Sequence, residues 1–206
     1  MTPARCRHTL AAVALAACLL AAAVAQARTG RGTRGADTLR GTVAADRLVG
    51  GAGDDRLLGR AGDDKLFGGP GRDRLVGADG NDRAFGAAGD DTLNGGADDD
   101  GLDGQAGNDL LSGFAGDDDL DGGAGDDRLG GGDGSDGLHG GDGNDRLDGG
   151  AGVDDVDGGA GDDIIDARDG EQDTIDCGAG DDVAIVDGQE DGVYDCEEVQ
   201  GPEGAP

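Results

Sequence analysis

The chain lacks most of the residues from which ordinary enzyme cores are built. Its 206 residues include no Trp, one Tyr, three Phe, one Met and four Pro. Only 16 Lys and Arg stand against 46 Asp and Glu, which gives a net charge of −30 at pH 7. The scarcity of large apolar side chains excludes an ordinary packed core, and the charge repels nucleic-acid phosphates and anionic lipids. Such a chain attracts cations instead.

The first 27 residues differ in composition from the rest and resemble a secretory signal peptide. Arg5, Arg7 and His8 form a basic start, and residues 10–25 carry no charge. Residues 25–27, Ala-Gln-Ala, fit a small-x-small cleavage site. The uncharged run is short for a transmembrane helix. We therefore expect residues 1–27 to be removed and the mature chain to be secreted and extracellular.

The four cysteines are divided between this leader and the rest of the chain. Residues 15–18, Leu-Ala-Ala-Cys, resemble a bacterial lipobox, so a cell-surface lipoprotein anchored at Cys18 stays open as an alternative. Against it, the apolar run continues beyond Cys18. Cys177 and Cys196 remain in the mature chain, and an even number of cysteines in an oxidising compartment predicts a disulfide.

A nine-residue period runs through most of the chain. An Asp recurs at every ninth residue in 15 consecutive units, and the residue five positions before it is always Gly. The residue two positions before it is Gly in 13 units, with Ala44 and Asp98 as the exceptions. Three registers held over this length predict a repeat architecture. The repeated aspartates are Asp37, Asp46, Asp55, Asp64, Asp73, Asp82, Asp91, Asp100, Asp109, Asp118, Asp127, Asp136, Asp145, Asp154 and Asp163.

This pattern resembles the repeats-in-toxin (RTX) family, also called haemolysin-type calcium-binding repeats, over residues 32–166. The resemblance implies an all-β parallel β-roll, a β-solenoid in which each unit forms a six-residue turn and a short strand and two units make one coil. It also implies several Ca²⁺ ions held by aspartate carboxylates and glycine carbonyls. The glycines at matching positions include Gly50, Gly53, Gly59, Gly62, Gly68, Gly71, Gly122, Gly125, Gly140, Gly143, Gly149, Gly152, Gly158 and Gly161.

The residues support this geometry independently of the resemblance. Glycines supply the positive φ angles of tight turns, and a strand with one apolar centre points that side chain inward and its neighbours outward. Two units per coil would give two inward ladders, in which we expect Ala84 to leave a small gap. One ladder is Leu39, Leu57, Leu75, Leu93, Leu111, Leu129, Leu147 and Ile165, and the other is Leu48, Leu66, Ala84, Leu102, Leu120, Leu138 and Val156.

Stacked aspartates require a counter-ion. At about 5 Å and an effective dielectric constant of 20, each neighbouring pair, such as Asp37 and Asp55, repels by about 3 kcal/mol before screening. A core of one aliphatic side chain per unit cannot offset this repulsion and the ordering entropy of a glycine-rich chain. We therefore expect no stable fold without a cation. Calcium fits the oxygen ligands better than zinc or magnesium, at roughly 13 sites at most, with the turns of Ala44 and Asp98 in doubt.

The positions beside the buried aliphatic residues should face solvent. Early units carry Arg47, Lys65 and Arg83 there, together with Phe67 and Phe85, and the spacing places all five on one sheet with the two rings stacked. Two interpretations stay open. The face is either a local charge balance with incidental apolar surface, or a contact face for self-association or for a cell-wall or protein partner.

The remaining residues suggest four segments in all. The signal peptide is followed by the calcium-binding roll over residues 28–166, a C-terminal cap over residues 167–199 and a disordered tail over residues 200–206. The cap breaks the nine-residue step, and a disulfide between Cys177 and Cys196 would close it. Within it, residues 177–182 weakly continue the repeat and resemble the segment that often closes such arrays.

The sequence favours a secreted, non-catalytic protein whose roll folds when it binds several calcium ions. Beyond residue 27 it has one His and two Ser, and it contains neither H-E-x-x-H nor G-x-S-x-G, so we expect no enzyme. A calcium-dependent adhesion or interaction module at the cell surface is the alternative.

Overall fold

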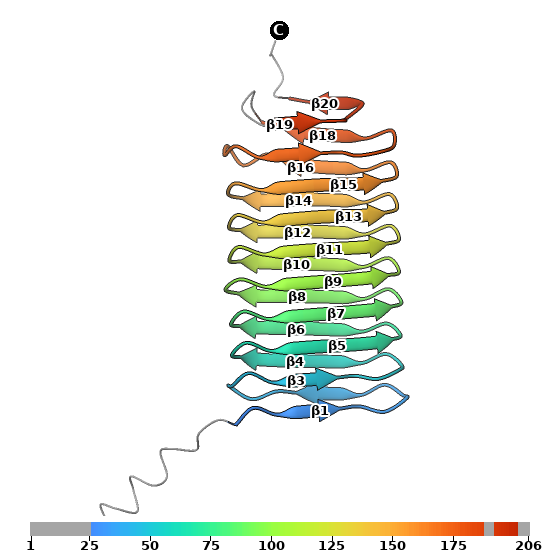
Figure 1. The fold of residues 1–206 in the computed structure, drawn as a ribbon, viewed down its shortest axis with the longest axis vertical. Helices are drawn as coiled ribbons and strands as arrows, with labels where there is room; N and C mark the ends of the chain where they lie inside the picture. The colour runs from blue at the N-terminus through green and yellow to red at the C-terminus, as the bar shows by residue number, and fades with distance from the viewer. Residues whose placement is uncertain (1–25, 188–191, 202–206) are drawn as a thin grey trace, which may run out of the picture.

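The computed structural model describes residues 26–187 and 192–201. Almost all of the expected signal peptide, residues 1–27, lies outside this part of the chain, as do residues 202–206 of the expected tail. The described residues form two parallel sheets of ten strands each, and consecutive strands alternate between the sheets (Figure 1). No helix in these described ranges is long and apolar enough to cross a membrane.

The odd-numbered strands make the first sheet and the even-numbered strands make the second. The first contains β1 (Thr29–Arg31), β3 (Arg47–Val49), β5 (Lys65–Pro70), β7 (Arg83–Ala88), β9 (Gly101–Ala106), β11 (Asp119–Ala124), β13 (Gly137–Asp142), β15 (Asp155–Ala160), β17 (Thr174–Asp176) and β19 (Gly192–Tyr194). The second contains β2 (Thr38–Arg40), β4 (Arg56–Ala61), β6 (Arg74–Asp79), β8 (Thr92–Ala97), β10 (Leu110–Ala115), β12 (Arg128–Asp133), β14 (Arg146–Ala151), β16 (Ile164–Ala167), β18 (Val183–Val186) and β20 (Glu198–Gln200).

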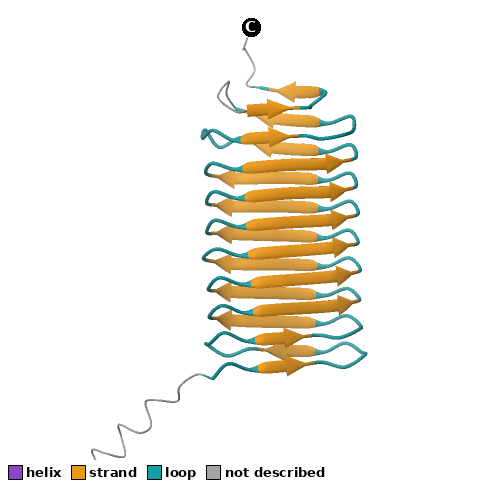
Figure 2. Cartoon of the chain, in the orientation of Figure 1, coloured by secondary structure: helices purple, strands orange, loops and turns teal. Residues whose placement is uncertain are grey.

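Each strand pairs in parallel with the strand two places further along the chain. Lys65 lies beside Arg83 and Leu66 lies beside Ala84, an offset of 18 residues. Two strands and their turns therefore make one coil, and the coils stack into an elongated solenoid with strands running across its long axis (Figure 2). The predicted parallel β-roll with two repeat units per coil is confirmed.

Strands β4 to β15 are each six residues long, which is longer than the short strand expected for one unit. The extra residues come from the glycine-rich half of the repeat, where Arg60 of β4 still pairs with Ala78 of β6. Because many of these residues are small, neighbouring backbones approach closely and the ladder continues. β4 ends at Ala61 and β5 begins at Lys65, so the connecting turn has three residues instead of the expected six.

The core is a single file of aliphatic side chains from each sheet. All the expected ladder residues are buried except Leu39 in the first complete coil, which is partly buried against the others. Ala84 lies between Leu66 and Leu102 on neighbouring strands and is 1% exposed. Since each repeat buries one such side chain, the hydrophobic contribution per coil is small for the length of chain that it orders.

The aromatic residues of the early coils lie on the outer face of the first sheet, as predicted. The rings of Phe67 and Phe85 stack with their centroids 5.1 Å apart and their planes 9° from parallel. The guanidinium carbon of Arg47 lies 4.0 Å from the centre of the Phe67 ring, within the range of a cation–π contact. Lys65 and Arg83 lie beside them on the same sheet.

Residues 167–199, which we expected to form the cap, add strands to both sheets of the roll. β17 pairs with β15 and β18 pairs with β16, but the offset is now 19 residues, as between Asp155 and Thr174. The predicted disulfide between Cys177 and Cys196 is present, with Cα atoms 5.1 Å apart. It therefore links consecutive coils at the C-terminal end of the solenoid.

Candidate functional site

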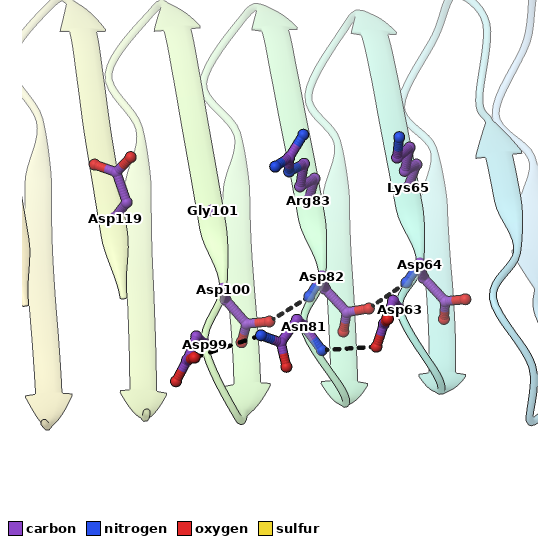
Figure 3. Close-up of a pocket in the computed structure, with 10 residues that line it drawn as sticks. All are labelled: Asp63, Asp64, Lys65, Asn81, Asp82, Arg83, Asp99, Asp100, Gly101 and Asp119. Atoms are coloured by element: carbon purple, nitrogen blue, oxygen red, sulfur yellow. Dashed lines mark hydrogen bonds between the residues drawn. The ribbon is translucent and has the colours of Figure 1, made fainter. Parts of the chain in front are cut away.

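The repeated aspartates form two ladders inside the turns. From Asp46 to Asp163 all are buried, with at most 4% of each residue exposed. The backbone N–H of each donates to Oδ1 of the aspartate one coil further along, at 2.7 Å from Asp64 to Asp82 and 2.8 Å from Asp82 to Asp100 (Figure 3). One carboxylate oxygen of each residue thus links two coils.

The second carboxylate oxygen, Oδ2, is buried without a hydrogen-bond partner in 13 of the described aspartates. A buried anionic oxygen without a donor is strongly destabilising, unlike one exposed to water. Each coil therefore repeats a buried carboxylate oxygen that a positive charge would stabilise. The residues are Asp55, Asp64, Asp73, Asp82, Asp91, Asp100, Asp109, Asp118, Asp127, Asp136, Asp145, Asp163 and Asp182.

Burial raises the pKa of these carboxyl groups, and repulsion between stacked carboxylates adds to the effect. The hydrogen bond from the backbone N–H acts in the opposite direction but is the smaller influence. The pKa rises to about 7 at Asp82, Asp91, Asp100 and Asp163, and to about 6 at Asp118, Asp127 and Asp154. The protein alone therefore disfavours the charged form that a metal ion would need.

Glycine carbonyls border the free oxygens. A Cβ atom on Gly50 would lie 2.3 Å from Oδ2 of Asp55 and 2.8 Å from the carbonyl oxygen of Gly68 in the next coil. A side chain at this position would occupy the space between these two oxygen atoms, which explains why every unit has glycine there. Of the predicted ligand glycines, Gly50, Gly59, Gly68, Gly122, Gly140, Gly149 and Gly158 hold this buried position.

The other predicted glycines form the bend of the turn itself. Gly71 has a φ of +141°, and a Cβ on it would lie 2.6 Å from the carbonyl oxygen of Gly53 one coil earlier. Left-handed backbone and close stacking both require glycine here. The residues at this position are Gly53, Gly62, Gly71, Gly125, Gly143, Gly152 and Gly161, with φ between +92° and +144°.

The two turns in which this glycine is replaced behave differently. Asp98 adopts a φ of +72°, which aspartate tolerates, and the backbone N–H of Asp82 still donates to Asp100 at 2.8 Å. The turn with Asp98 therefore keeps the arrangement of its neighbours. Ala44 does not adopt a positive φ.

The first two turns satisfy their carboxylates with the protein's own donors. The N–H and hydroxyl groups of Thr33 donate to Oδ2 of Asp37 at 2.6 and 2.9 Å, and the N–H of Thr42 donates to Oδ2 of Asp46. In later coils this position has positive φ, which β-branched threonine disfavours. Asp37 and Asp46 belong to the ladders but do not present a free Oδ2.

Both ladders extend past the predicted array. The N–H of Asp154 donates to Asp173 at 2.9 Å, and the N–H of Asp163 donates to Asp182 at 2.8 Å. Sequence reasoning did not assign these two residues, because they follow their predecessors by 19 positions and fall out of the nine-residue step. The Gly-Ala-Gly-Asp-Asp run at residues 178–182 was the available signal.

The residues that directly precede the ladder aspartates are exposed on the outside of the turns. The N–H of Asn81 donates to Oδ1 of Asp63 at 3.3 Å, and its amide nitrogen donates to Asp99 at 3.4 Å (Figure 3). These short polar side chains therefore form an exposed ladder beside the buried ladder of aspartates. Arg72 pairs with Asp90 at 2.6 Å in the same type of position and lowers the pKa of Asp90.

The available ligands suit a hard cation. No group of three or more His, Cys, Asp and Glu side chains gathers around one point in the part of the chain that the structure describes. A metal site here would therefore combine carboxylates with backbone carbonyls, as calcium prefers. The buried free oxygens and neighbouring glycine carbonyls meet that requirement.

Comparison with known protein families matches this chain to the model described as the RTX calcium-binding nonapeptide repeat, in four copies. The copies cover residues 31–66, 67–102, 102–129 and 130–166, which together are more than half of the chain. No curated protein sequence matches the chain.

Adding one methyl group to the glycine beside a free oxygen should destabilise the roll. A Cβ on Gly131 would lie 2.3 Å from Oδ2 of Asp136, whereas a Cβ on the adjacent Gly130 would meet nothing within 4 Å. We expect Gly131→Ala to lower the free energy of unfolding by about 1–3 kcal/mol, and Gly130→Ala to change it by less than about 0.5 kcal/mol. Chemical denaturation compares the two variants, and equal transition midpoints would contradict the placement of Gly131 beside the free Oδ2 of Asp136.

Acid should favour folding of the metal-free chain. Because the folded-state pKa of Asp82, Asp91, Asp100 and Asp163 is raised to about 7, the folded chain keeps protons that the unfolded chain releases above its ordinary pKa of 3.8. Their stabilisation is complete below that value and is lost as pH rises through about 7. Circular dichroism in chelator should show more strand at pH 4 than at pH 8, with light scattering to exclude aggregation. Equal strand content at pH 4 and pH 8 would contradict the raised pKa values of these aspartates.

Proposed function

The chain belongs to the RTX calcium-binding nonapeptide repeat family, and we propose that it is a secreted, non-catalytic protein whose roll folds on binding several Ca²⁺ ions between stacked turns. One observation carries the proposal most directly. The buried Oδ2 atoms recur along both edges beside glycine carbonyls. Calcium ions would supply the positive charge that these oxygens lack.

The proposed ligands are the carboxylates from Asp55 to Asp163 and the carbonyls of the predicted glycines. Each aspartate keeps its carboxylate in place by accepting the N–H of the previous coil. Each buried glycine exposes its carbonyl oxygen at the same place without a side chain to obstruct it. Asp37 and Asp46 remain proposed ligands, but the hydrogen bonds to their Oδ2 atoms make us expect weaker sites there.

Three features support secretion and a non-catalytic role. The basic and apolar leader at residues 1–27 fits export, and the disulfide between Cys177 and Cys196 suits an oxidising compartment. His139 lies on the outer face of β13 and pairs with Asp157 at 3.2 Å. Low calcium inside the cell would keep the chain unfolded for export, and extracellular calcium would then fold it.

Removing one ladder carboxylate should weaken calcium-dependent folding. Asp109 is buried with a free Oδ2, whereas Asp119 is exposed on the outer face of β11. We expect wild-type chain to gain strand signal on calcium titration but not with magnesium or chelator. Asp109→Asn should raise the required calcium concentration by about tenfold, because a charged ligand is lost, and Asp119→Asn should not.

Two results would contradict this function. One is a metal-free chain at neutral pH that already has the full strand signal, which would remove the folding role. The other is equilibrium dialysis that finds only one or two bound calcium ions per chain, which would remove the repeated site.

The stacked aromatic face favours a second candidate, a calcium-dependent interaction module. The rings of Phe67 and Phe85 stack on each other, and Arg47 lies over the Phe67 ring, on a sheet that would form only in the folded roll. A partner with apolar or aromatic groups, or a second copy of the chain, would fit this face.

Replacing both rings tests the second candidate. Phe67→Ser with Phe85→Ser should abolish calcium-dependent self-association in sedimentation and binding to isolated cell wall. Leu110→Ser, which changes a 45% exposed residue on the other sheet, is the control. Unchanged sedimentation and unchanged cell-wall binding in the double variant would rule out this face.

A further inference from the structure

We propose one further calcium site, resting on the function proposed above, at the C-terminal end of the repeat array. It lies between residues 158–163 of the last repeat and residues 177–182 beyond it. Asp163 and Asp182 would supply its carboxylates, and Cys177 would supply a backbone carbonyl. The matched repeats end at residue 166, so half of this site lies outside them. The disulfide between Cys177 and Cys196 would hold that half in place.

The ligand arrangement of the array is reproduced at this point. A Cβ on Gly158 would lie 2.8 Å from Oδ2 of Asp163 and 2.5 Å from the carbonyl oxygen of Cys177. In the array the corresponding carbonyl belongs to glycine, as Gly68 does opposite Gly50. Cysteine thus replaces glycine in sequence while its backbone keeps the same position.

Each of two buried carboxylates has one oxygen without a donor at this site. Asp163 and Asp182 are 1% and 0% exposed, and the Oδ2 of each has no hydrogen-bond partner. Oδ1 of Asp182 accepts the N–H of Asp163 at 2.8 Å, so the two carboxylates follow one another as in every earlier coil. Buried carboxylate oxygens that a cation would stabilise therefore continue past the last repeat.

The disulfide and its neighbours secure the outer half of the site. Cys177 is fully buried, and its N–H donates to the carbonyl of Tyr194 at 3.1 Å. Glu197, next to Cys196, accepts the N–H of Asp182 at 2.9 Å, in the role that an aspartate of the next coil would otherwise play. These contacts replace the support that a further coil would give.

The opposite edge of the same coils does not provide this arrangement. On this edge Asp148 pairs with Asp166, so the position equivalent to Cys177 is Ala167. The next residue, Arg168, pairs its guanidinium with Asp166 at 2.5 Å. A Cβ on Gly149 would find no atom of the next coil closer than 3.2 Å. The added site is therefore expected on one edge only, and Asp173 is a matched control for Asp182.

Terbium luminescence can test this site selectively. The chain has a single Tyr and no Trp, and Tyr194 is hydrogen-bonded through its backbone to Cys177. Terbium binds the same oxygen ligands as calcium, and tyrosine sensitises its emission only at short range. In the full chain, we expect tyrosine-sensitised emission to be lost in Asp182→Asn and kept in Asp173→Asn and Asp91→Asn. Native mass spectrometry should show one calcium ion fewer for Asp182→Asn and no loss for Asp173→Asn.

The outcomes separate this inference from the proposed function. The added site would be wrong if Asp182→Asn left the emission and the number of bound calcium ions unchanged. It would also be wrong if Asp173→Asn lost both to the same extent. In either case, a wild-type chain that binds many calcium ions would still support the array. A wild-type chain that binds no calcium would overturn both. Cys196→Ser should lose the emission but keep the calcium-induced strand signal of the array. Emission that persists in this variant would overturn the role of the disulfide.

Discussion

The buried aspartate ladder is the constraint on which the rest of this molecule depends. One oxygen of each carboxylate ties two coils together through a backbone N–H. The other oxygen is sealed inside the turn without a donor, and burial together with neighbouring carboxylates raises the pKa. The same residue therefore joins the coils and destabilises the metal-free roll, and this is the basis of the proposed control of folding by a cation.

The thin core and the glycine content follow from this constraint. The ladder needs turns that stack closely enough for each N–H to reach the next carboxylate, and side chains at positions such as Gly50 and Gly71 would prevent that approach. Each unit consequently buries a single aliphatic residue such as Leu66. Such an interior contributes little against the charge repulsion, which is why we propose that metal binding and folding are coupled.

The two ends of the roll end the ladder in different ways. At the N-terminal end, Thr33 and Thr42 supply donors to Asp37 and Asp46, so the protein itself satisfies those carboxylates. At the C-terminal end, a disulfide holds the final coils together and Glu197 accepts the last ladder N–H.

The sequence by itself determined the coil. The nine-residue recurrence of Asp, with an aliphatic residue two positions later, predicted a repeat architecture, and its resemblance to the RTX family implied two units per coil. From that coil followed the inward ladders and the stacked pair of Phe67 and Phe85, because a repeated spacing places equivalent residues in register. Only the tertiary structure decided which carboxylates remain free. Whether an Oδ2 meets an N–H, as at Asp37, or lies unpartnered, as at Asp182, depends on backbone directions in neighbouring coils. Spacing along the chain does not encode those directions, and a single inserted residue moved Asp173 and Asp182 out of the nine-residue step.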